Sequence, residues 1–281
     1  MKLLRYGEIG REKPGILDQS GRIRDLSRIV PDFAGEALGR ESLTRLKALD
    51  LAKLPLVEGE PRLGPPVGVV PKFLGIGLNY RDHAEETGMP LPEVPIVFAK
   101  ASSCVSGPTD PVLQPKGFKR MDFEVELAFV VGTRAKNVSE SQALDHVAGY
   151  CVCNDLSERS LQKGGPGEWI KAKSYDSFGP LGPWLITTDE IPDPQKLELT
   201  LDLNGTRMQT GSTSTMVFSV AALLAYISQY MTLTPGDVIT TGTPPGVGMA
   251  RNPRVFLQAG DELRLSVSGL GEQRVTVVAE S

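Results

Sequence analysis

Acidic and apolar residues alternate in the segment RMDFEVELAFVVG, which spans residues 120–132. In a strand, residues two apart project from the same face, so Glu124 and Glu126 can reach one cation together. Carboxylate oxygens are hard ligands that select Mg²⁺, Mn²⁺ or Ca²⁺. Because two carboxylates are too few for a good site, a third ligand is needed, and Asp155 at the end of CVCND is a candidate.

The alternative for this segment is a strand face exposed to solvent, which is the usual setting of a Glu-x-Glu pattern. Ala128 and Val130 argue against exposure, because they continue the face of Glu124 and Glu126 into an uncharged stretch. Carboxylates buried without a partner would cost roughly several kcal/mol, and a cation is the simplest partner. Asp122 lies at the outer end and is expected to be an ordinary surface acid.

The two histidines of the chain leave few options for a histidine-based mechanism. His83 lies in GLNYRDHAEETG, where Asn79 is expected to cap a short helix and Gly88 to end it. On that helix His83 and Glu86 are three residues apart and therefore neighbours. A carboxylate beside an imidazole fixes its tautomer and raises its basicity, which suits a general base. The alternative is a surface ion pair, and His146 has no expected role.

Other candidate motifs give weaker signals. Cys151 and Cys153 share the strand face of Asp155, but soft thiolates combine poorly with carboxylates, so buried core cysteines are expected. GIGLNY lacks the third glycine of a dinucleotide fingerprint, and TGTPPGVG lacks a following Lys-Ser/Thr. TGTPPGVG directly follows an expected strand, and its N–H groups and threonine hydroxyls could hold a carboxylate, although a structural turn is equally consistent.

The elements that must position these residues are mostly strands. Residues 1–65 are predicted to form a small N-terminal α+β domain, which ends in a Pro/Gly-rich linker, and residues 66–281 are predicted to form the catalytic domain. Two helices are expected in the second part: one from a capping box at Ser139 to about Val147, and one from about Ser219 through VAALLAYISQYM. Since strands outnumber helices and do not alternate with them, the predicted class is α+β and strand-rich.

Composition and charge exclude several classes of protein. The chain has 281 residues, of which 40% are hydrophobic and 23% charged, as in ordinary globular proteins. A net charge of −4 and a pI near 5.4 argue against nucleic-acid or anionic-membrane partners. The N-terminus does not resemble a signal peptide, and three cysteines without framework spacing fit a cytoplasmic protein with reduced thiols.

Five segments, in chain order, resemble the fumarylacetoacetate hydrolase superfamily: GLNYRDHAEE, FEVELAFVVG, GYCVCNDLSERSLQ, WIKAKSYDSFGPLGP and TGTPPGVG. The resemblance extends from about residue 70 to residue 281, and the MKLLRYG module resembles the longer bacterial members. Those members include 2,4-diketo-3-deoxy-sugar-acid hydrolases, acylpyruvase-like enzymes and ureidoglycolate lyases. The family fold that this resemblance implies is a rolled, barrel-like mixed β-sheet with few helices, commonly in a homodimer.

The resemblance also implies roles for individual residues. The ligands of Mg²⁺ or Mn²⁺ would be Glu124, Glu126 and Asp155. A dyad on a lid helix and a lysine that stabilises developing negative charge would be the catalytic residues His83, Glu86 and Lys173. The substrate would be held by Lys100, Arg159, Gln162 and Thr243.

The activity implied by the resemblance is metal-dependent hydrolysis of the C3–C4 bond of a 2,4-diketo acid (a 3-acylpyruvate). The favoured substrate is 2,4-diketo-3-deoxy-L-rhamnonate or -fuconate, which would give pyruvate and lactate. His83, oriented by Glu86, would deprotonate the attacking water. The alternatives are a β-keto-acid (oxaloacetate-type) decarboxylase, an enol–keto isomerase, a ureidoglycolate lyase, and a binding protein without catalytic activity.

Overall fold

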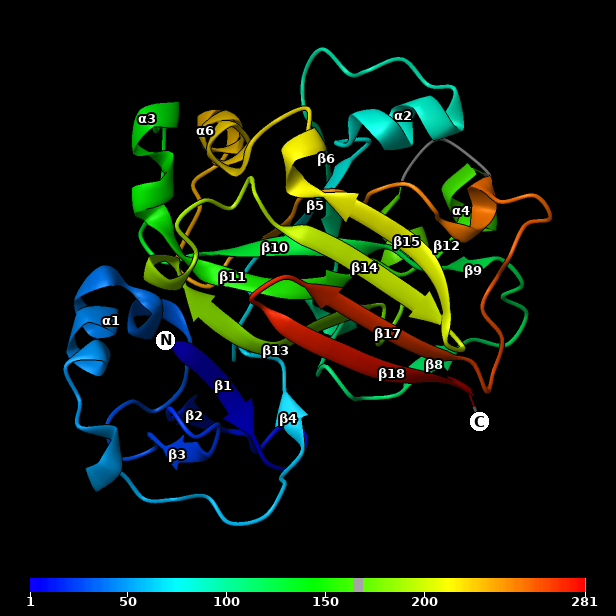
Figure 1. The fold of residues 1–281 in the computed structure, drawn as a ribbon. Helices are drawn as coiled ribbons and strands as arrows, with labels where there is room; N and C mark the ends of the chain where they lie inside the picture. Colours follow the sequence, from blue (N-terminus) through cyan, green and yellow to red (C-terminus); the bar gives the residue numbers. More distant parts are fainter. Residues whose placement is uncertain (164–168, 281) are drawn as a thin grey trace.

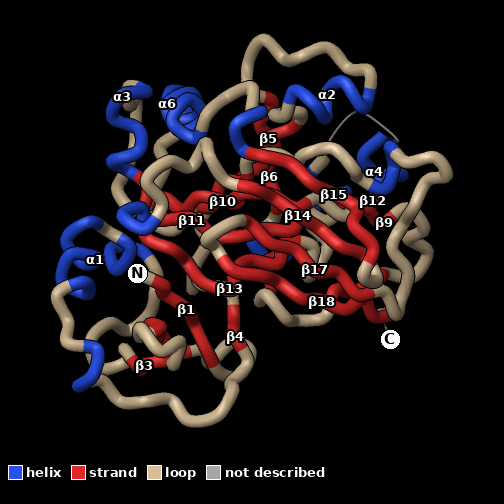
Figure 2. The backbone as a smooth tube through the Cα atoms, in the orientation of Figure 1, coloured by secondary structure: helices blue, strands red, loops and turns tan. Residues whose placement is uncertain are grey.

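The computed structural model describes residues 1–163 and 169–280, and strands dominate it (Figures 1 and 2). The larger sheet has the order β3-β2-β1-β13-β11-β10-β16-β5-β6, with β4 beside β1 and β7 beside β13. Its strands are β1 (Lys2–Tyr6), β2 (Lys13–Leu17), β3 (Ile23–Asp25), β4 (Leu63–Gly64), β5 (Phe73–Gly77), β6 (Ile96–Lys100), β7 (Val105–Ser106), β10 (Val125–Val131), β11 (Val147–Asn154), β13 (Gly179–Thr187) and β16 (Val238–Thr240).

A second sheet lies across the face formed by β10, β11 and β13 (Figure 1). The buried amide of Gln273 joins the two layers by donating to the carbonyls of Val152 and Pro180, at 2.8 and 3.0 Å. The second sheet has the order β15 (Thr206–Ser212), β14 (Glu198–Leu203), β17 (Glu262–Val267), β18 (Gly271–Ala279) and β8 (Val112–Gln114). A separate short pair consists of β9 (Met121–Asp122) and β12 (Ser157–Glu158).

The strand-rich α+β class predicted from the sequence is confirmed. The sheets formed by the described residues are open and do not close into a barrel. β1 pairs with β2 on one side and with β13 on the other, so the N-terminal strands extend the large sheet. Arg62 also ties the two parts together, because its guanidinium bonds Glu12 and Asp110. The division of the chain between residues 65 and 66 stays a prediction.

The α-helices are α1 (Arg40–Lys47), α2 (Arg81–Thr87), α3 (Glu140–Ala143), α4 (Arg159–Lys163), α5 (Ile170–Lys173) and α6 (Val220–Tyr230). Those labelled in Figure 2 lie around the edges of the sheets. The prediction for α6 is confirmed, since the Ser219 hydroxyl accepts the Ala222 N–H at 3.1 Å. No helix among residues 1–163 and 169–280 is long and apolar enough to cross a membrane.

Helix α3 is shorter than predicted. It ends at Ala143, and the 3₁₀ turn Leu144–His146 follows. The expected cap is not made, because the Ser139 hydroxyl donates to the Gln142 side chain at 2.8 Å and bonds no backbone N–H of the helix. The first turn therefore lacks the stabilisation that the capping box predicted.

Strand β10 lies at the centre of the core. All of its residues are buried, it pairs antiparallel with both β11 and β16, and both of its faces are covered. This setting explains its uninterrupted apolar run, since a strand covered on both faces needs no polar alternation. The β10–β11 register places Glu126 opposite Cys153, so Asp155 follows the end of β11 next to the start of β10. Cys104, Cys151 and Cys153 are buried free thiols, as expected for Cys151 and Cys153.

Candidate active site

Three carboxylates meet at the ends of β10 and β11. Oxygens of Glu124, Glu126 and Asp155 lie within 4.8 Å of one another, and all three residues are buried. The alternation in β10 and the antiparallel pairing of β10 with β11 bring them together. The alternative of a solvent-exposed face is therefore wrong, and the inward course inferred from Ala128 and Val130 is confirmed.

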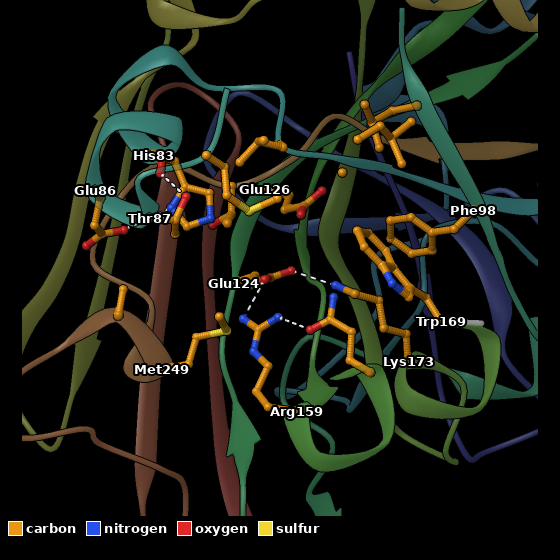
Figure 3. A pocket seen from close by; sticks show the side chains of 18 residues that line it. His83, Glu86, Thr87, Phe98, Glu124, Glu126, Arg159, Trp169, Lys173 and Met249 are labelled. Atoms are coloured by element: carbon orange, nitrogen blue, oxygen red, sulfur yellow. Dashed lines mark hydrogen bonds and ion pairs between the residues drawn. The ribbon is translucent and has the colours of Figure 1, made fainter. Parts of the chain in front are cut away.

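Three buried cations surround these acids. Lys173 Nζ donates to Glu124 Oε2 at 2.7 Å and also to Asp155. Arg159 Nη2 lies 2.6 Å from Glu124 Oε1 (Figure 3). Lys100 Nζ lies 2.6 Å from Asp155 Oδ1 on the other side. Although burial opposes ionisation, the charges of Arg159 and Lys173 hold the pKa of Glu124 well below its usual range.

Glu126 lies in a different electrostatic setting. Its Oε2 accepts the Gly242 N–H at 2.8 Å, and no lysine or arginine in the described parts of the chain forms an ion pair with it. Burial, together with the charges of Asp155 and Glu124, raises the pKa of Glu126 well above its usual value. A divalent cation among these three oxygen donors would offset that repulsion, so the residues fit a hard ion such as Mg²⁺ or Mn²⁺.

Asp122 is the clearest error of the sequence interpretation. It is fully buried, not a surface acid. Its Oδ2 accepts Arg159 Nε at 2.8 Å, and its two oxygens accept the N–H groups of Gly248 and Met249 at 2.7 and 3.0 Å. Asp122 is covered because β9 pairs with β12. It thus joins Arg159 to the 3₁₀ turn Gly248–Ala250.

The histidine dyad predicted on α2 is present. His83 Nδ1 lies 2.9 Å from Glu86 Oε2, while Glu86 Oε1 accepts the Gly246 N–H at 2.9 Å. Gly88 ends the helix as predicted, in the left-handed conformation with φ of 65°. The predicted cap at Asn79 is wrong. The buried amide of Asn79 instead bonds the carbonyl of Thr241 at 2.8 Å and both backbone groups of Phe218, so it is not available to α2.

A cavity of about 470 Å³ opens between the dyad and the acids. Figure 3 shows His83 and Glu86 on one side of Glu124, with Lys173 on the other. Predicted site residues that line this cavity are His83, Glu86, Glu124, Glu126, Arg159, Gln162, Lys173 and Thr243. Asp155 and Lys100 lie behind the lining, fully or almost fully buried.

The four predicted substrate-binding residues already have protein partners. Arg159 Nη1 donates to Gln162 Oε1 at 2.8 Å, in addition to its carboxylate bonds. Thr243 donates to the Val125 carbonyl at 2.9 Å and accepts from Gln209 at 2.7 Å. Lys100 donates to Asp155 and to two carbonyls, so its amine faces the acids and not the cavity.

Sequence reasoning missed the apolar lining of the cavity. Phe98 and Trp169 form a tilted pair with ring centroids 5.1 Å apart, and Ile96 and Met249 add further apolar surface. A signal for Phe98 was present in the sequence. In IVFAK, Phe98 and Lys100 are two residues apart, so their side chains project from the same face of the strand. If Lys100 reached the acids, Phe98 had to lie on the side of the strand that faces them.

Comparisons with known proteins agree with this geometry. The model of the family described as fumarylacetoacetate (FAA) hydrolase C-terminal matches residues 72–278. A protein from Burkholderia ambifaria, provisionally named a hydrolase, is 62% identical over 274 residues, which are 97% of each chain. The structure of fumarylacetoacetate hydrolase from Exiguobacterium antarcticum is 34% identical, with a TM-score of 0.88 over 100% of both chains.

A further similar structure contains a metal ion and a keto acid. Maleylpyruvate hydrolase from Sphingobium sp. SYK-6, in complex with manganese(II) and pyruvate, is 28% identical, with a TM-score of 0.84 over 100% of both chains. The family match covers most of the chain and includes the segments that carry the three acids and most of the cavity lining. This chain therefore belongs to the fumarylacetoacetate hydrolase family.

Proposed function

We propose that this protein is a divalent-metal-dependent hydrolase that cleaves the C3–C4 bond of a 3-acylpyruvate and releases pyruvate. One observation carries the proposal: the His83–Glu86 dyad lines the same cavity as Glu124 and Glu126, two of the three clustered carboxylates. The dyad suits activation of water, and the carboxylates suit a cation that binds a keto acid. The pyruvate and manganese(II) in the related Sphingobium hydrolase support the same chemistry.

Glu124, Glu126 and Asp155 would hold Mg²⁺ or Mn²⁺, which when bound supplies Lewis-acid polarisation of the substrate's oxygens. In the tautomer that this proposal uses, His83 Nδ1–H donates a hydrogen bond to the Glu86 carboxylate, which leaves Nε2 unprotonated and free to act as the base. His83 Nε2 takes a proton from water, and the hydroxide adds to the C4 carbonyl. The C3–C4 bond then breaks. C4 leaves as a carboxylic acid, and C3 retains the electron pair as the enolate of pyruvate, which a proton converts to pyruvate.

Two lysines have separate parts in this proposal. Lys173 lines the cavity beside Glu124, where its ammonium can neutralise the negative charge that forms on the C4 oxygen when the hydroxide adds. Lys100 is fully buried against Asp155, so we assign it to positioning that carboxylate and not to binding the substrate. Arg159, Gln162 and Thr243 line the cavity and are proposed to position the substrate's carboxylate and oxygens.

The acyl group is the part of the substrate that the family resemblance constrains least. The candidates named from the sequence, 2,4-diketo-3-deoxy-L-rhamnonate and -fuconate, carry a hydroxylated lactoyl group and would yield lactate. We retain a small-molecule diketo acid as the substrate class. A homodimer and a cytoplasmic location also stay predictions, and light scattering of the purified protein measures the first directly.

The test is pyruvate release from a panel of acylpyruvates and 2,4-diketo sugar acids, by the purified protein with Mg²⁺ or Mn²⁺. We expect turnover with at least one compound and loss of turnover after chelation. The absence of pyruvate from every member of the panel would refute the hydrolase assignment. Replacing His83 with Ala separates the hydrolase from a decarboxylase: hydrolysis should disappear, whereas decarboxylation of oxaloacetate needs no activated water and would survive.

A further inference from the structure

Strand β6 presents one face to the candidate active site. Ile96, Phe98 and Lys100 alternate along it, and the first two line the cavity while Lys100 reaches Asp155. Phe98 also lies close to the charged centre, because Lys173 Nζ is 5.0 Å from the centroid of its ring. The same strand therefore fixes an acid of the centre and an apolar wall of the cavity.

Two glycines of β5 make room for this wall. Gly75 pairs with Phe98, and a Cβ added there would lie 2.2 Å from the Phe98 ring. A Cβ added at Gly77 would lie 2.8 Å from the ring of Trp169. Both distances are shorter than any side chain tolerates, so the two aromatic rings occupy the space that these glycines leave free. This steric role accounts for the glycines of GIGLNY, which do not fit a phosphate-binding loop.

The cavity is divided into a polar centre and apolar surroundings. Phe98 and Trp169 lie beside Lys173, on the side of Glu124 away from the dyad (Figure 3). The carboxylate and oxo groups of an acylpyruvate require the polar centre, because burying them against carbon would cost hydrogen bonds. The surface left for the acyl group is then mainly apolar, and its aromatic rings occupy the space that Gly75 and Gly77 leave free.

We propose that Phe98 and Trp169 form the acyl-binding wall and that the acyl group of the substrate is an unsubstituted aliphatic chain or an aromatic ring. This inference rests on the proposed hydrolase function and specifies its substrate class. A hydroxylated acyl group such as lactoyl would place its hydroxyl against carbon atoms, with loss of its bonds to water. Each methylene buried on the wall should instead raise kcat/KM about fourfold.

The experiment compares kcat/KM for acetylpyruvate, hexanoylpyruvate, benzoylpyruvate and 2,4-diketo-3-deoxy-L-rhamnonate by pyruvate release. We expect hexanoylpyruvate and benzoylpyruvate to exceed acetylpyruvate by more than about tenfold, and the lactoyl compound to fall below both. Replacing Trp169 with Leu, or Phe98 with Leu, should reduce the hexanoyl-to-acetyl ratio about tenfold while acetylpyruvate is still hydrolysed. Gly77→Ala, which pushes on the Trp169 ring, should reduce the ratio in the same direction without removing a wall residue.

The control is another aromatic pair. Tyr226 and Tyr230 have ring centroids 5.0 Å apart with a similar tilt, and neither residue lines the cavity. Tyr230→Leu should therefore leave the ratio unchanged. Two results would refute the acyl-binding wall without affecting the hydrolase assignment. One is a preference for the lactoyl compound. The other is a hexanoyl-to-acetyl ratio that responds to Met249→Ala but not to the Phe98 and Trp169 variants. If no compound releases pyruvate, the hydrolase assignment and the wall both fail.

Discussion

The two carboxylates at the start of β10 have opposite electrostatic surroundings in this protein. Glu124 contacts Arg159 and Lys173, whereas Glu126 accepts a backbone N–H and lies near other acids. Removing the charge of Glu124 takes one carboxylate partner from each of two buried cations, which leaves Arg159 with Asp122 and Lys173 with Asp155. Removing the charge of Glu126 relieves repulsion. The two residues should therefore respond differently to the same substitution.

Replacing Glu124 with Gln should lower the free energy of unfolding of the metal-free protein by roughly 3–5 kcal/mol, as expected when one partner of a buried ion pair is lost. Glu126→Gln should leave that free energy unchanged or raise it, because the amide oxygen can still accept the Gly242 N–H. Both variants should weaken Mn²⁺ binding by more than about tenfold. Denaturant unfolding in EDTA and calorimetric Mn²⁺ titration measure the two effects, and equal destabilisation by both variants would contradict this account.

Asp122 should act on the site through Arg159. Asp122→Asn keeps an acceptor for the N–H groups of Gly248 and Met249 but removes the charge that faces Arg159. We expect a loss of about 3 kcal/mol in unfolding free energy and a higher KM with a smaller change in kcat. Asp145 is the control, since its pair with Arg40 is exposed: Asp145→Asn should change stability by less than about 0.5 kcal/mol. An Asp122→Asn enzyme with wild-type KM would show that Asp122 does not position Arg159.

At this scale, much of the site could be predicted from the sequence. The acids of β10 were visible because alternation and an uncharged continuation occur in one segment. Asp122 was misassigned because its cover comes from β12, more than thirty residues later, a pairing that no local pattern reveals. No local pattern reveals the burial of Lys100 either, since its ammonium donates to the carbonyl of Phe178, 78 residues later.

At the scale of elements, α2 is held at its C-terminal end. Glu86 connects it to the Gly246 N–H, and Gly88 closes its last turn with a positive φ. The sequence predicted the closing glycine and the dyad, because both depend on spacing within one helix. It did not predict the true role of Asn79, whose partners lie more than a hundred residues away.

Gly88→Ala tests whether the end of α2 matters for catalysis. The substitution should cost about 1 kcal/mol of stability, because alanine disfavours a φ of 65°, and it should lower kcat/KM by loosening the helix that carries His83. Gly59 is a matched control, with a φ of 74° and likewise no atom near an added Cβ. Gly59→Ala should cost similar stability and leave kcat/KM unchanged. Equal changes of kcat/KM in the two variants, measured by pyruvate release, would show that the end of α2 does not matter for catalysis.

For the whole molecule, the strand-rich class followed from the sequence, but the sheet order did not. β1 lies beside β13, and β5 beside β16, although each pair is separated by more than 150 residues. The alternation of apolar and polar residues along a strand shows which face is buried, but it does not show which distant strand pairs with it. The structure shows that β1, β2 and β3 continue the large sheet, while the predicted division of the chain between residues 65 and 66 stays a prediction.

This continuity predicts how the protein unfolds. The N-terminal strands share a ladder with β13, and Arg62 bonds both Glu12 and Asp110 across the two parts of the chain. We expect residues 1–65 and 66–281 to unfold in a single cooperative transition, measured by calorimetry with the calorimetric and van't Hoff enthalpies equal. Arg62→Met should lower the midpoint of the whole transition, because it leaves Glu12 and Asp110 without this partner. Two results would instead show that the N-terminal part is an independent domain, as the division between residues 65 and 66 predicts. One is a transition that Arg62→Met splits in two. The other is an unchanged unfolding midpoint for a chain of residues 66–281.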